Sequence, residues 1–274
     1  MVTIGDIPKR VLPKPVKKVL KRIGYHYRNR PFKPYLKKKN IEGVIFDFWI
    51  CDRVGRDWYD LQCTDPVWPE MRFIKDHLIR QGDVILECGG HHGCTAIALS
   101  NWVGAGGKVV TFEPSPANCD IIEKNIRLNG LQNVILERKA VGAERGRITI
   151  DDESDSSVIM EGKGIEVEMT CLDEYKHLNP TFLKIDVEGF EMQVLQGAKN
   201  ILATRPKLAV EIHTNNLSYY GASVQDLFRL IDVQNYKLWI QRNGGKPPVE
   251  YDMSIPIVEG VVHLFGIPIE DEAV

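Results

Sequence analysis

Short, mostly apolar runs recur along the middle of the chain, and each of them ends at a polar residue or a glycine turn. Val84–Leu86, Val109–Phe112 and Phe182–Ile185 are three such runs. Runs of this length are typical of parallel strands that are buried on both faces. Between them lie segments with apolar residues at helical spacing, such as 116–129 and 188–202. This alternation predicts an α/β fold built on a parallel sheet.

The remaining elements complete the predicted sheet and its flanking helices. Four further strands of the sheet are expected at 133–141, 207–213, 236–241 and 259–268, and helices at 66–80, 94–103 and 222–233. An apolar strand is also expected ahead of them, at 44–50. Residues 144–172 alternate between polar and apolar positions, which predicts short antiparallel strands joined by an acidic turn. Together these elements predict a Rossmann-like three-layer sandwich with a seven-stranded, mostly parallel sheet and helices on both faces.

Charge divides the chain into two unequal parts. Residues 1–40 hold thirteen Lys or Arg and one acid, although the formal net charge of the whole chain is −2. Within them the apolar residues of 16–23 have the spacing of a short amphipathic helix. We therefore predict a basic N-terminal extension, 1–40, ahead of one catalytic domain, 41–274. Through residues 9–39 the extension is expected either to dock on an anionic membrane surface or to pack as a basic arm on the acidic body.

Composition narrows the predicted location. The sequence has no run of about eighteen apolar residues of the kind that spans a membrane. The six cysteines are scattered and include no C-x-x-C pair, which is typical of reduced thiols. A cytoplasmic location is therefore predicted, with peripheral contact at the inner face of the membrane as the role of the basic extension.

The strand at Val84–Leu86 leads into a glycine-rich turn that is expected to bind a cofactor. Its glycines let the backbone approach a ligand, and the helix that starts near Gly93 points its unpaired N–H groups at the same place. A dinucleotide fingerprint would need a third glycine at Cys88, so that motif is not met. Glu87 at the strand end would repel a pyrophosphate and suits a cationic group. Gly89 and Gly90 form the turn itself.

The next predicted strand ends at a second acid. Glu113 stands one βαβ unit after Glu87, at the sheet edge where ligands bind, and it can accept both hydroxyls of a ribose. Pro114 follows it directly, and Ala140, near the end of the third predicted strand, is expected beside an adenine ring. A ligand with an amino group, a carboxylate and a ribose fits this arrangement. S-adenosylmethionine has all three.

Four further polar residues are expected to converge beyond the methyl group of that cofactor. Asp186 and Glu188 follow one strand, and Glu211 and His213 share one side of the next by period-two alternation. His213 or Asp186 is a candidate general base, since the cofactor itself supplies the activated methyl group. A divalent ion held by Asp186, Glu211 and His213 would lower the pKa of an acceptor hydroxyl instead, and the pattern leaves this choice open.

Zinc ligand types also occur on the cofactor turn. Four ligands on one tight turn cannot easily converge tetrahedrally, and a metal there would displace the cofactor. These residues are Cys88, His91, His92 and Cys94. No zinc site is therefore predicted at the turn.

Several stretches of the chain resemble the FkbM family of S-adenosylmethionine-dependent methyltransferases. They are ILECGGHHGCT, VVTFEPSPANCDIIEKNIRLNG, and FLKIDVEGFEMQVLQGA followed by RPKLAVEIH, within about residues 66–215. The resemblance implies a class I methyltransferase fold and O-methylation of a sugar or natural-product hydroxyl. It places the family's cofactor-binding residues on Glu87, Gly89, Gly93 and Glu113. Family members often carry Gly-Ala-Asn where this chain has Gly89, Gly90 and His91, so the contact at the methionine end would fall to His91, whose imidazole can donate a hydrogen bond.

Two other function classes are weighed against this prediction. A nucleic-acid methyltransferase would explain the basic extension, but the chain has no D/N-P-P-Y/F motif and no Pro-Cys nucleophile after the fourth strand. A non-catalytic binding protein would not need acids at both strand ends. The sequence therefore favours a methyltransferase with a small-molecule or saccharide acceptor, and nucleic acid is the alternative.

Overall fold

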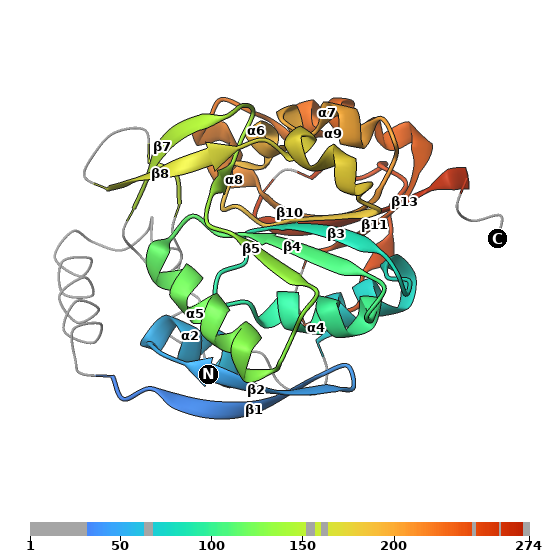
Figure 1. Cartoon of the computed structure of the whole chain (residues 1–274). Helices are drawn as coiled ribbons and strands as arrows, with labels where there is room; N and C mark the ends of the chain where they lie inside the picture. The colour runs from blue at the N-terminus through green and yellow to red at the C-terminus, as the bar shows by residue number, and fades with distance from the viewer. Residues whose placement is uncertain are drawn as a thin grey trace, which may run out of the picture.

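A twisted eight-stranded sheet forms the centre of the protein (Figure 1). The computed structural model describes residues 32–62, 68–151, 157–159, 164–242, 245–257 and 259–270. The strand order is β12-β11-β13-β10-β9-β3-β4-β5. Their bounds are β3 Val84–Cys88, β4 Lys108–Phe112, β5 Val134–Glu137, β9 Phe182–Ile185, β10 Lys207–His213, β11 Tyr236–Gln241, β12 Val249–Glu250 and β13 Val261–Pro268.

The sheet is mostly parallel, as the apolar runs predict. Strands β10, β9, β3, β4 and β5 are parallel to one another, whereas β13 runs antiparallel to both β10 and β11, and β12 antiparallel to β11. The sequence predicts seven strands in this sheet, and the eighth is the two-residue edge strand β12. Its sequence, Val-Glu, is too short to carry an alternation signal.

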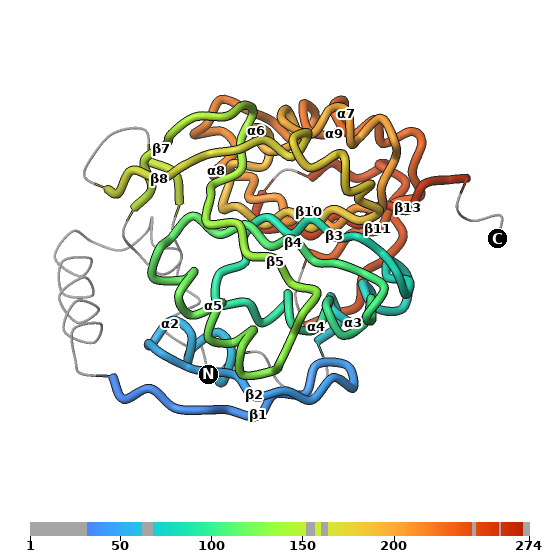
Figure 2. Tube along the Cα trace, viewed as in Figure 1, coloured from blue at the N-terminus to red at the C-terminus, as the bar shows by residue number. Residues whose placement is uncertain are grey.

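Helices cover both faces of the sheet and make three layers (Figures 1 and 2). One face packs on α6 Glu191–Gln196, α7 Lys199–Leu202 and α9 Val224–Ile231. The other faces α4 Cys94–Val103 and α5 Pro116–Leu128. Successive strand residues point to opposite layers, so Leu86 joins the first core and Ile85 the second. The predicted three-layer sandwich is confirmed.

A hairpin forms a further layer outside α4 and α5 (Figure 1). Strand β1 Tyr35–Ile41 pairs along its whole length with β2 Val44–Ile50. Asn125 of α5 and its C-cap residue Asn129 accept hydrogen bonds from the backbone N–H groups of Trp49 and Asp47, at 2.7 and 3.0 Å. The predicted domain boundary after residue 40 thus falls inside β1. The amphipathic helix at 16–23 lies outside the described residues, and so does most of the basic extension.

A small second sheet stands beside the main one and corrects one strand prediction. It contains β6 Ala140–Val141, β8 Ile165–Thr170 and β7 Gly146–Ile150 in that order. The third strand of the main sheet therefore ends at Glu137, and Ala140 belongs to β6 instead. Strands β7 and β8 are antiparallel, as predicted. The acidic turn between them lies largely outside the described residues.

The helix predicted over 188–202 is broken into α6 and α7. Gly197 ends α6, and a Cβ on it would lie 2.1 Å from the carbonyl oxygen of Gly142, so the chain turns where the small sheet approaches it. A short helix after β10, α8 Thr214–Tyr219, has no counterpart in the predictions. The remaining short elements are α2 Arg53–Arg56, η2 Asp57–Gln62, α3 Pro69–Phe73, η3 Ile74–Leu78, η4 Leu172–Leu178 and η5 Val233–Asn235.

The topology places a ligand crevice at β3. From this strand the chain continues through β4 to β5 on one side, and β9 and β10 lie on the other. In such sheets ligands bind outside the carboxyl ends of the strands at the point where the strand order reverses. None of the described helices is both long and apolar enough to cross a membrane.

Candidate active site

The turn after β3 is shaped by its contact with the neighbouring strand. Gly89 has φ +92°, and a Cβ on it would lie only 1.8 Å from the carbonyl oxygen of Asp186. The N–H groups of Gly89 and Gly90 both donate to the carbonyl of Phe112 at the end of β4, at 3.0 Å. Gly93, with φ +82°, then leads into α4. The turn is therefore held between the ends of β4 and β9, as the prediction of a cofactor turn requires.

Glu87 is fully buried at the end of β3. Its Oε1 accepts a hydrogen bond from the Thr95 hydroxyl of α4, and β3–β9 pairing places it opposite Lys184. Burial raises the pKa of Glu87, and the Lys184 ammonium and the Thr95 hydrogen bond oppose the shift. Its Oε2 is buried without a hydrogen-bond partner among the described residues. This oxygen is the kind of orphaned acceptor that a ligand amino group would satisfy.

Glu113 lies directly after β4 and binds the cofactor turn from the other side. Its Oε2 accepts from the His91 N–H at 2.8 Å, and its Oε1 accepts from Ser115 N at 3.0 Å and Asn118 Nδ2 at 3.2 Å. Burial raises the pKa of the Glu113 carboxyl to about 7, although the hydrogen bonds from these three donors act to lower it. A carboxylate has about four acceptor positions, so one remains for a ribose hydroxyl. Pro114 leads from Glu113 to the N-cap Ser115 of α5.

The N-terminal segment after β2 covers the two histidines of the turn. His91 has φ +47°, and its Nδ1 shares a 2.6 Å hydrogen bond with the hydroxyl of the buried Tyr59. Of the aromatic residues in this part of the chain, Phe48 is fully buried, whereas Tyr59 contacts the cofactor turn. The side chain of His91 is therefore directed at this covering segment.

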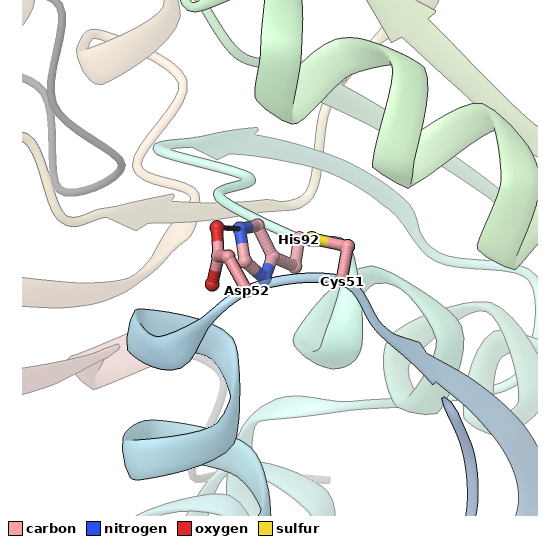
Figure 3. Close-up of side chains that lie close together, drawn as sticks. All are labelled: Cys51, Asp52 and His92. Carbon is pink, nitrogen blue, oxygen red and sulfur yellow. Dashed lines mark ion pairs between the residues drawn. The ribbon is translucent and has the colours of Figure 1, made fainter. Parts of the chain in front are cut away.

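His92 lies outside the cofactor crevice. Its ring stacks on His91 with 4.0 Å between centroids, and its Nε2 is 3.7 Å from Asp52 Oδ2, with Cys51 close by (Figure 3). Burial lowers the pKa of His92 to about 4, so its ring is neutral at pH 7. Among the described residues, Cys88 and Cys94 do not join it in a metal-type cluster. The ligand types of the turn are thus not brought together, and the ligand-type atoms of His92 lie instead within 4.8 Å of those of Cys51 and Asp52.

The four polar residues of the acceptor side do come together. Asp186 follows β9, and His213 ends β10, with its Nε2 3.4 Å from Glu188 Oε2 and 3.6 Å from Glu211 Oε1. Ligand-type atoms of Asp186, Glu211 and His213 lie within 4.8 Å of one another. Burial, together with the charge of Asp186, raises the pKa of Glu211 to about 8. The predicted convergence at the ends of β9 and β10 is therefore observed.

The carboxylates around His213 raise the pKa of its ring. Burial alone would lower its pKa, but the hydrogen bond from its Nδ1 to Glu191 Oε1, at 2.8 Å, and the charge of Glu188 outweigh burial. The pKa of His213 is raised to about 9 as a result. The ring is thus held in one orientation, with Nε2 toward the carboxylates.

Three residues of the site were not predicted from the sequence. Glu191, fully buried at the start of α6, orients His213. Lys184, only 5% exposed, has its Nζ 3.7 Å from Asp186 Oδ2. His263 of β13 pairs with Glu211 across the sheet, with 3.7 Å between Nδ1 and Oε2. Period-two alternation puts Lys184 on the same side as Asp186, and this signal was available.

The fold and the site define a class of enzyme. A mostly parallel sheet with two buried acids at the ends of adjacent strands, the first of which leads into a glycine turn, is the arrangement of a class I methyltransferase. A profile described as the methyltransferase FkbM domain matches residues 87–238, more than half of the chain. The chain belongs to the FkbM methyltransferase family.

Solved structures share this fold at low sequence identity. Methyltransferase FkbM from Methylobacillus flagellatus KT matches with a TM-score of 0.50 and 18% identity, covering 70% of this chain and 45% of that protein. An S-adenosylmethionine-dependent O-methyltransferase from Thermotoga maritima matches with a TM-score of 0.43 and 14% identity, over 84% and 77% of the two chains. This chain thus spans less than half of the Methylobacillus protein. No curated protein matches the sequence.

Proposed function

We propose that the chain transfers a methyl group from S-adenosylmethionine to a hydroxyl of a sugar or natural product. The observation that carries the proposal is the pair of buried acids on either side of the glycine turn. Glu87 offers an unpartnered buried oxygen for the amino group of the cofactor. Glu113 keeps one acceptor position for its ribose. Bound there, the cofactor supplies an activated methyl group, and the protein has to align the acceptor and take up its proton.

The acceptor side supplies the groups for that second task. Asp186 and Glu188 are the accessible carboxylates of the group, with side chains 30% and 43% exposed. Carboxylates accept hydrogen bonds from hydroxyls, and they accept a proton in general base catalysis. Because neighbouring carboxylates raise the pKa of His213 to about 9, we assign proton uptake to the carboxylates rather than to its ring. Asp186, Glu211 and His213 also have the ligand types of a divalent cation site.

Calorimetric titration with S-adenosylmethionine tests the cofactor assignment. Glu113→Gln should bind about 10- to 150-fold more weakly than the wild type, because a hydrogen bond to a charged group contributes about 1.5–3 kcal/mol. Glu123→Gln is the matched control, since Glu123 is a surface carboxylate of α5 that pairs with Arg127 and Arg138. Equal affinity in Glu113→Gln and wild type would contradict the assignment, and absence of any binding would overturn the proposed function.

The acceptor can be found by comparing glycans and small metabolites from cells with and without the protein. Mass spectrometry should reveal a species that carries one additional methyl group only when the protein is present. A methylated nucleoside in hydrolysed RNA or DNA, with no methylated glycan or metabolite, would favour the nucleic-acid alternative instead. That alternative depends on the basic extension, most of which lies outside the described residues.

The basic extension itself is proposed to hold the enzyme at the cytoplasmic face of an anionic membrane, near a lipid-linked acceptor. Each basic residue near such a surface contributes about 1 kcal/mol. Flotation with anionic vesicles should recover the full chain, and a chain that begins at Phe32 should stay behind. The shortened chain keeps strand β1 and the hairpin. Equal recovery of the two chains would contradict membrane contact.

A further inference from the structure

His213 is held in the manner of a metal-ligating histidine. Its side chain is 8% exposed, and its Nδ1 is tied to the fully buried Glu191, which also accepts from the Gly189 N–H at 2.9 Å. Its Nε2 has no hydrogen-bond partner among the described residues and faces Glu188 and Glu211, 3.4 and 3.6 Å away. Metal-ligating histidines almost always use their other ring nitrogen in this way, with a carboxylate that sets the tautomer.

The spacing of the surrounding ligand atoms suits one cation. Asp186, Glu211 and His213 each offer one atom, and the three lie within 4.8 Å of one another. Ligands of a six-coordinate ion with bonds of about 2.1 Å lie about 3–4 Å apart, so small side-chain movements would complete the site. The residues come from the ends of β9 and β10, two adjacent parallel strands beside the cofactor turn. A cation there would lie on the acceptor side of the methyl group.

Carboxylates outnumber the basic side chains around this point. Asp186, Glu188, Glu191 and Glu211 are four carboxylates, three of which lie within 3.6 Å of the His213 ring nitrogens. Lys184 is the ammonium group beside Asp186, and it also faces Glu87 across the sheet. The Nδ1 of His263 lies 3.7 Å from Glu211 Oε2 and 3.6 Å from Glu70 Oε1, so the positive charge of its ring is divided between two carboxylates. A divalent cation bound at the neutral His213 ring would take the place of its proton and supply positive charge to these carboxylates.

We propose that Asp186, Glu211 and His213 bind one divalent cation of the magnesium or manganese type, and that this cation binds the acceptor hydroxyl. The inference rests on the proposed O-methyl transfer. The cation lowers the pKa of the hydroxyl, and Glu188 takes its proton. The oxygen then attacks the methyl carbon, the carbon–sulfur bond breaks with its electron pair going to sulfur, and the products are a methyl ether and S-adenosylhomocysteine. Glu188 returns the proton to water.

Manganese binding can be measured without knowing the acceptor. The full-length chain is dialysed against EDTA, freed of chelator and titrated with Mn²⁺ while electron paramagnetic resonance follows the free ion. We expect one tight site per chain. Glu211→Gln and His213→Gln should weaken it by at least tenfold, and Glu191→Gln by 10- to 100-fold, because loss of such outer partners typically has that effect. Glu123→Gln should bind as the wild type does.

The outcomes separate this inference from the proposed function. Circular dichroism confirms that each variant folds, and Glu211→Gln provides a second ligand variant if His213→Gln does not. A chain that binds S-adenosylmethionine by calorimetry but shows no Mn²⁺ site would overturn the cation site and leave the methyl transfer standing. Unchanged Mn²⁺ affinity in both ligand variants would also overturn it. A chain that binds Mn²⁺ but not S-adenosylmethionine would refute the proposed function.

Discussion

Protonation of Glu113 should make the binding of S-adenosylmethionine depend on pH. Burial raises the pKa of its carboxyl from 4.5 to about 7, and the protonated carboxyl has lost the charge and an acceptor position that the ribose would use. One unit below its pKa a carboxyl is about one-tenth ionised. The association constant at pH 6 should therefore be about a tenth of its value at high pH. At pH 8 it should be close to its value at high pH. Calorimetric titration at pH 6, 7 and 8 measures this change.

Protonation of Glu113 should weaken cofactor binding, but it should stabilise the folded state of the ligand-free chain. Folded Glu113 holds its proton more tightly than the unfolded chain does, so its contribution to stability is present at low pH. It is lost as the pH rises from 4.5 to about 7. This shift corresponds to about 3 kcal/mol. Glu113→Gln should remove that part of the pH dependence of the unfolding free energy, as measured by urea denaturation.

Two results would refute this reasoning. One is an association constant for the wild type that does not change between pH 6 and pH 8. The other is a Glu113→Gln variant that keeps the wild-type slope, because the titrating group would then be a different one, such as the buried Glu87.

Three substitutions test the structure around the site. Gly89→Ala places a Cβ 1.8 Å from the Asp186 carbonyl oxygen, so it should abolish cofactor binding and lower the melting temperature. A variant that binds the cofactor normally would contradict the turn geometry. Tyr59→Phe removes the hydrogen bond to His91, which contributes about 0.5–1.5 kcal/mol, and should weaken cofactor binding about 2- to 12-fold by calorimetry. Unchanged binding would show that the segment after β2 does not contribute to the cofactor site. Phe182→Ala, at a fully buried position in β9, should cost about 3–5 kcal/mol in urea unfolding, and a loss under 1 kcal/mol would contradict its burial.

The elements with strong local signals were predictable from the sequence. Strand β10 and helix α4 begin and end where the apolar spacing indicated, at Lys207–His213 and Cys94–Val103. Strand β1 was missed because Lys37, Lys38 and Lys39 hide its alternation, although Lys39 is only 1% exposed. The break at Gly197 depends on contact with Gly142, more than fifty residues earlier in the chain, and no local pattern reports such a contact.

The candidate site was predictable where strand ends supply the residues. Glu87, Glu113 and Asp186 follow directly from the rule that parallel strands present their carboxyl ends at one edge. The direction in which a side chain points was not predictable. His91 meets Tyr59 from a segment about thirty residues earlier, and only the folded chain shows this. The hydrogen bond of Glu191 to His213 likewise needs the three-dimensional placement of α6 against β10.

A crystal structure of the full chain with S-adenosylhomocysteine is the most direct test of the cofactor site. The account predicts that a ribose hydroxyl contacts Glu113, the amino group lies at Glu87, and the sulfur faces the group formed by Asp186, Glu188, Glu211 and His213. Density for the ligand away from the turn at Gly89–Gly93, or with its sulfur directed away from the ends of β9 and β10, would contradict it.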